Sequence, residues 1–113
     1  MSRQLGQQKE SQACAYLQEQ GLILVDKNFH TRYGEIDLIM RERDTWVCVE
    51  VKYRRVSQFG TAMETVTAGK LKKLQLAFEQ YLIGRGLSPV STPMRIDVVA
   101  LDGPTLQWLK CVH

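Results

Sequence analysis

The sequence predicts an α/β (α+β) fold in which helices flank a mixed sheet. Two segments carry apolar residues at helical spacing, and three segments between them are rich in β-branched and aromatic residues. The second helical segment is long enough to form a crossover connection, so the strand that follows it can pair in parallel. The expected order is therefore helix, three strands, helix and strand.

Each element has its own signal. Residues 2–20 are good helix formers with a stop at Gly21, and Thr67 can cap a second helix that ends at residues 84–86. Short β-rich runs between polar or glycine-containing breaks predict the strands. We expect these at residues 22–25, 35–40, 46–53 and 95–101, with a last edge strand at residues 106–112.

Length and composition predict one domain, residues 1–113. Hydrophobic residues make up 44% and charged residues 24% of the chain, which is typical of a globular protein. The net charge of +3 favours a polyanionic partner only weakly. The three cysteines are far apart and form no C-x-x-C motif, and no apolar run is long enough to span a bilayer. A reducing, cytoplasmic location without membrane association is therefore expected.

Two predicted strands carry acids among apolar residues. Alternation along residues 46–53 places Glu50 and Lys52 on one face, and the valines take the other. On the preceding strand Asp37 shares a face with Glu35, and Ile36, Leu38 and Met40 take the opposite face. Charges at such positions need compensation, because an unpaired buried charge is unfavourable.

The turn between these strands suggests what compensates them. If Arg43 and Asp44 form a two-residue loop, Asp37 lies opposite Glu50 and Glu35 lies opposite Lys52. Facing carboxylates repel unless one is protonated or a cation lies between them, and Mg²⁺ prefers oxygen ligands. A magnesium site is therefore one interpretation, and an ion pair of Glu50 with Lys52 at a solvated sheet edge is the alternative.

Other charged residues admit two interpretations each. Glu10 lies on the apolar stripe of the first helix, so it could complete a metal site or be a solvated helix residue. Glu35 is expected to be a structural partner of Lys52 or Arg32. Asp97 lies within a predicted strand, and pairing with a basic neighbour such as Arg95 is the preferred interpretation.

Several short motifs occur in a specific order along the chain: GEIDLI at 34–39, VCVEVKYR at 47–54, FG at 59–60, ETVT at 64–67 and KLKKL at 70–74. With these motifs the sequence resembles the YraN-type family of predicted Holliday-junction-resolvase-like endonucleases, over about residues 6–101. That family resembles the PD-(D/E)XK nuclease superfamily. The resemblance implies a restriction-endonuclease-like core and metal-dependent cleavage of branched or structured DNA, with a homodimer as a reasonable assembly.

The resemblance also implies roles for single residues. Asp37 and Glu50 would be ligands of Mg²⁺, with Mn²⁺ as a substitute, Lys52 would be the motif lysine, and Glu10 would be an auxiliary acid. The sequence departs from the pattern at Ile36, where the motif has proline, and at Lys9, where relatives often have a small residue.

Basic residues flank the acidic strands and predict a rim that binds nucleic-acid phosphates. A solvated polar face explains the lysines of the second helix about as well. The residues expected to bind nucleic acid are Arg32, Arg54, Arg55, Lys70 and Lys73. The leading hypothesis is a metal-dependent endonuclease. The alternatives are a non-catalytic nucleic-acid-binding module that retains the nuclease fold and a small scaffold protein.

Overall fold

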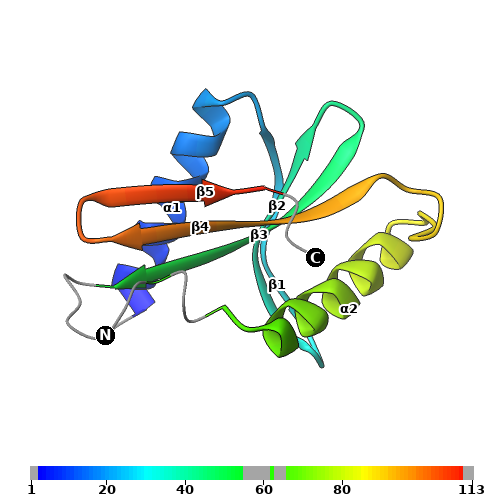
Figure 1. Cartoon of the computed structure of the whole chain (residues 1–113). Helices are drawn as coiled ribbons and strands as arrows, with labels where there is room; N and C mark the ends of the chain where they lie inside the picture. The colour runs from blue at the N-terminus through cyan, green and yellow to red at the C-terminus, as the bar shows by residue number, and fades with distance from the viewer. Residues whose placement is uncertain (1–2, 55–61, 63–65, 111–113) are drawn as a thin grey trace.

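A computed structural model describes residues 3–54, 62 and 66–110. These residues form a five-stranded mixed sheet with one helix on each face (Figure 1). The predicted fold class and element order are confirmed. In chain order the elements are α1 (Arg3–Glu19), β1 (Ile23–Thr31), β2 (Gly34–Glu42), β3 (Thr45–Arg54), α2 (Ala68–Gly84), β4 (Met94–Asp102) and β5 (Thr105–Leu109).

The strands follow one another across the sheet in chain order, β1-β2-β3-β4-β5. Neighbouring strands are antiparallel except β3 and β4, which pair in parallel along nine residue positions from Trp46–Met94 to Arg54–Asp102. As the sequence predicted, α2 is the crossover that permits this parallel pair. The order is compatible with a nuclease-like core.

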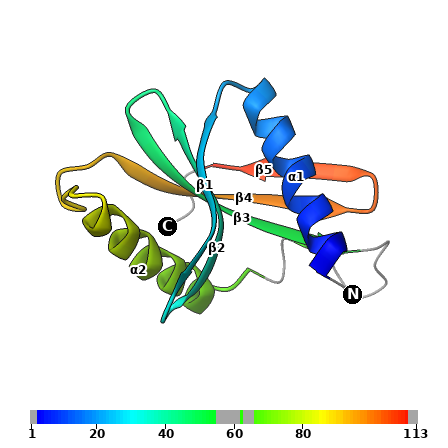
Figure 2. The same ribbon diagram turned by 180° about the vertical axis from the view of Figure 1, so that it is seen from behind.

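The sheet separates two hydrophobic cores, and each helix covers one of them (Figure 2). On the α1 side, Ala13, Cys14 and Leu17 pack on valines of β3 and on Leu38 and Met40 of β2. On the α2 side, residues of the helix pack on the opposite face of the sheet. The helix contributes Leu74, Phe78, Tyr81 and Leu82, and the strands contribute Ile36, Ile39, Trp46, Cys48 and Ile96.

The hairpin of β2 and β3 has the predicted two-residue loop. Its pairs run from Glu42–Thr45 to Leu38–Val49, which confirms the predicted register over that stretch. Pairing ends there, one position before Asp37 would meet Glu50. The predicted alternation was wrong at Ile36, which packs on the α2 side, whereas Leu38 packs on the α1 side. The regular strand geometry therefore breaks at Asp37.

The first strand is longer than the sequence predicted. β1 continues through a polar stretch to Thr31, with an irregularity in its pairing between Leu24 and Asp26. Polar residues are compatible with this position, because β1 is an edge strand with exposed side chains. Asn28 has a φ of 53°, a left-handed conformation that asparagine tolerates better than most residues.

The end of the chain agrees with the prediction in part. β5 ends at Leu109, and the remainder of the predicted 106–112 strand beyond residue 110 lies outside the described residues. Within the described ranges, neither helix is long and apolar enough to cross a membrane.

Candidate metal and phosphate site

Asp37 lies just beyond the last β2–β3 pair, and its carboxylate, instead of a backbone carbonyl, is the hydrogen-bond acceptor for a backbone N–H of β3. Its Oδ2 accepts a hydrogen bond of 2.8 Å from the backbone N–H of Val51 in β3. Burial, and after it the charge of Glu50, raises the pKa of Asp37 to about 8, although the hydrogen bond from Val51 opposes the shift. The fold therefore holds Asp37 where its negative charge is poorly compensated by protein groups.

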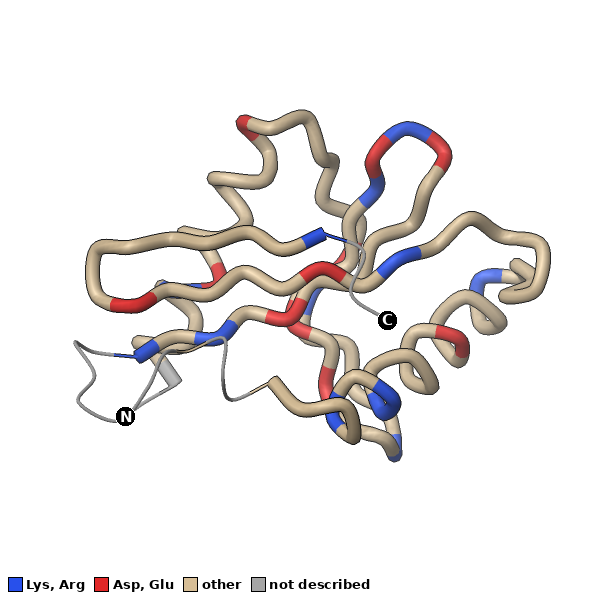
Figure 3. The backbone as a smooth tube through the Cα atoms, viewed as in Figure 1, with Lys and Arg blue, Asp and Glu red and all other residues tan. Residues whose placement is uncertain are grey.

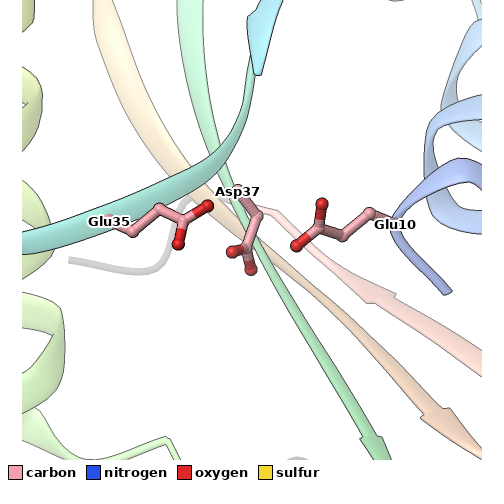
Figure 4. Close-up of side chains that lie close together, drawn as sticks. All are labelled: Glu10, Glu35 and Asp37. Carbon is pink, nitrogen blue, oxygen red and sulfur yellow. The ribbon is translucent and has the colours of Figure 1, made fainter. Parts of the chain in front are cut away.

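Two further carboxylates converge on Asp37. Glu10 reaches it from α1 and Glu35 from β2, and one oxygen of each of the three acids lies within 4.8 Å of the others (Figure 4). Carboxylate oxygens at this separation are a donor set that suits a hard divalent cation. Of the two interpretations of Glu10, the structure thus favours the one that places it beside Asp37, and it adds Glu35 to the cluster.

Asn28 joins two of these acids. Its side-chain amide donates one hydrogen bond to Glu10 Oε1, at 3.0 Å, and one to Glu35 Oε2, at 2.7 Å. The prediction that Glu35 pairs with Lys52 or Arg32 is not what the described contacts show, because the β2–β3 pairing ends before Glu35 could face Lys52. Asn28 was missed because the predicted first strand ended at residue 25, and an asparagine in a polar stretch gives no distinct signal.

Glu50 lies beside this cluster on β3, with 4% of its surface exposed. Its Oε2 accepts from the ammonium groups of both Lys52, at 3.2 Å, and Lys70, at 2.9 Å. The pKa of Lys52 is lowered, first by burial and then by the neighbouring Lys70, against the opposing effect of Glu50. Burial alone would lower the pKa of Lys70 too, but its contacts with Lys52 and Glu50 raise it.

The acids and lysines line one pocket of about 700 Å³. The first turns of α2 form one wall of this pocket and contribute Lys70 and Lys73. In Figure 3 the acidic positions of the central strands lie near these basic turns. The sequence assigned both lysines to a phosphate-binding rim, and it missed that Lys70 also forms an ion pair inside the site.

The remaining basic residues of the predicted rim lie at different places. Arg32 is exposed in the β1–β2 turn, where its guanidinium donates to the hydroxyl of Tyr33 and lies over that ring. Arg54 ends β3 and is half-buried. Arg55 lies outside the described residues.

Asp97 is not part of this site. Although fully buried, it accepts two hydrogen bonds from Arg95, at 3.0 and 3.2 Å, and one of 3.0 Å from the indole N–H of Trp108. The predicted pairing with Arg95 is confirmed. Asp97 thus has a guanidinium partner, whereas the buried Glu50 is paired with lysines that line an open pocket.

Comparison with known proteins gives a consistent family assignment. The model of an uncharacterised protein family, UPF0102, matches residues 9–101. A UPF0102 protein of Colwellia psychrerythraea is 49% identical over 109 residues, covering 93% of this chain and 84% of the relative. UPF0102 proteins of Shewanella loihica and Shewanella frigidimarina are 44% and 45% identical, and each match covers at least 92% of this chain and 89% of the relative.

Proposed function

The chain belongs to the UPF0102 family, and we propose that it is a divalent-metal-dependent endonuclease that hydrolyses phosphodiester bonds in branched or structured DNA. The observation that carries the proposal is the convergence of Asp37, Glu10 and Glu35 in a pocket whose other wall is basic. Acids alone would indicate only cation binding. Acids beside lysines in one pocket fit a cation together with a phosphate group.

The residues fit Mg²⁺, or Mn²⁺ as its substitute. Asp37, Glu10 and Glu35 offer only oxygen donors, and Glu50 is a fourth carboxylate beside Asp37. A divalent cation would offset the repulsion that raises the pKa of Asp37. When bound, such an ion supplies a water of lowered pKa and neutralises charge on a phosphate oxygen.

Lys52 is suited to act on the reacting groups. It projects from β3 into the same pocket, and its lowered pKa makes proton exchange at Nζ easier than for an exposed lysine. In the proposed reaction its Nζ orients the attacking water and stabilises the charge that develops on the phosphate.

The proposed substrate follows from the lysines that line one wall of the pocket. Lys70 and Lys73 can contact phosphates, and such contacts position nucleic acid without reading its sequence. We therefore expect salt-sensitive binding that selects structure rather than sequence. Cleavage of two strands of a junction would need two such centres, which a symmetric homodimer would supply.

The test is cleavage of a four-way junction, a flap and a plain duplex with Mg²⁺ or Mn²⁺. Wild type is compared with Asp37→Ala and Lys52→Ala, and Lys72→Ala is the matched control because Lys72 is an exposed lysine of α2 outside the pocket. We expect metal-dependent cleavage that both site variants lose and the control keeps. Salt-sensitive binding without cleavage of any substrate would instead favour a non-catalytic nucleic-acid-binding module.

A further inference from the structure

Lys70 and Lys52 both form ion pairs with the buried Glu50. In the described structure the ammonium of Lys70 is 2.9 Å from Glu50 Oε2, and the ammonium of Lys52 is 3.2 Å from the same oxygen. These two ion pairs compensate the charge of the buried Glu50 in the absence of metal. Both ammonium groups lie at the oxygen Oε2, where a cation bound to that oxygen would also lie.

A divalent ion on Glu50 would be repelled strongly by both ammonium groups. Hard cations bind carboxylate oxygens at roughly 2.0–2.6 Å, so such an ion would lie within a few ångströms of each lysine. Like charges at that separation in a partly buried site are unfavourable. Withdrawal of one lysine would relieve this repulsion when the metal binds.

The geometry indicates which lysine withdraws. Lys52 is two residues from Glu50 on the same strand, so the backbone keeps the two side chains together. Lys70 comes from the first turn of α2, and its side chain is 37% exposed, against 25% for Lys52. Its flexible stem can therefore leave Glu50 without any change in the sheet.

A phosphate group bound in the pocket would be a second partner for the ammonium group of Lys70 once that group leaves Glu50. Lys73 lines the same wall three residues further along α2, and residues at that spacing are neighbours on a helix. A phosphate group in the pocket would lie between these ammonium groups and the acids. We propose that Lys70 is a placeholder cation, which neutralises Glu50 in the metal-free protein and moves to a phosphate of the nucleic acid when the divalent ion binds. This inference rests on the proposed function and assigns an order of events to the same site.

In this exchange the ammonium group of Lys70 and the divalent ion compete for Glu50. Removal of the Lys70 charge should therefore increase the affinity for the metal. Mn²⁺ affinity is measured by titration calorimetry on the full chain without nucleic acid, for wild type, Lys70→Met, Lys70→Gln and the control Lys72→Met. We expect about tenfold tighter Mn²⁺ binding in both Lys70 variants, within the usual range for coupled sites, and no change in the control. A purely structural ion pair would give equal or weaker binding, because its loss would distort the site.

The second measurement follows the phosphate. Affinity for a labelled four-way DNA junction is titrated against salt in Ca²⁺, and Lys70→Met should weaken binding and reduce the slope of log affinity against log salt by about one. If wild type binds Mn²⁺ and the Lys70 variants bind it equally or more weakly, the exchange is wrong, but the proposed nuclease function is not affected. Absence of Mn²⁺ binding in wild type overturns both. Junction binding unchanged in Lys70→Met overturns the move to phosphate.

Discussion

Asp37 should destabilise the metal-free protein when it is ionised. Because burial and Glu50 raise its pKa from 3.8 to about 8, folding favours the protonated acid. The stabilising contribution of that proton is complete below about pH 4 and is lost as the pH rises through about 8. Asp37→Asn removes the charge, and its amide oxygen can still accept from the N–H of Val51.

The magnitude follows from the size of the pKa shift. Each unit corresponds to about 1.4 kcal/mol, and pH 7 lies about three units above the pKa of 3.8, so keeping Asp37 protonated in the folded protein at pH 7 would oppose folding by at most about 4 kcal/mol. Relaxation and water entry reduce such effects, since buried sites respond as if the effective dielectric constant were about 20. We therefore expect Asp37→Asn to raise the free energy of unfolding by about 1–3 kcal/mol at pH 8, and by clearly less at pH 5.

Urea unfolding in EDTA at the two pH values measures this difference. Asp97→Asn is the matched control, because Asp97 is also buried but pairs with Arg95, so the same chemical change should lower stability. Mg²⁺ should raise the stability of wild type and have little effect on Asp37→Asn. An Asp37→Asn protein that is no more stable than wild type at pH 8, or equally shifted at both pH values, would refute the reasoning.

Three other variants test separate parts of the structure. Asn28→Gly keeps the left-handed backbone but removes the amide that joins two acids, so Mn²⁺ binding measured by calorimetry should weaken by about tenfold. Glu42→Gln should reduce stability at pH 7 more than at pH 3, because the hydrogen bond from Arg95 lowers the pKa of Glu42. The resulting stabilisation is lost as the pH falls through this lowered pKa. An equal loss of stability at both pH values would contradict this. Phe78→Ala, in the α2-side core, should lower the free energy of unfolding by about 3–5 kcal/mol in urea titrations, and a loss under about 1 kcal/mol would contradict the burial of this side chain.

Local patterns were sufficient to predict the central hairpin and its acids. The loop of Arg43 and Asp44 fixed the register, and the alternation of valines with Glu50 and Lys52 identified the two faces of β3. Both signals lie within a few residues of the positions that they describe. The helix bounds followed in the same way from a capping threonine and a glycine stop.

Features that depend on contacts between distant segments were not predictable in this way. Nothing near Asn28 in the sequence indicates that it would join Glu10, 18 residues earlier, to Glu35. The packing of Ile36 on the α2 side depends on the break at Asp37, which in turn depends on a bond to Val51. Lys70 resembles any solvated helix lysine until α2 is placed against Glu50.

The parallel pairing of β3 with β4 has a consequence for how the chain folds. Trp46 pairs with Met94, so the centre of the sheet is completed only after α2 and the following loop have been made. All four acids of the pocket belong to α1, β2 and β3, which can assemble first through local hairpins. During synthesis β3 is therefore a bare edge with a closely spaced group of carboxylates beside it.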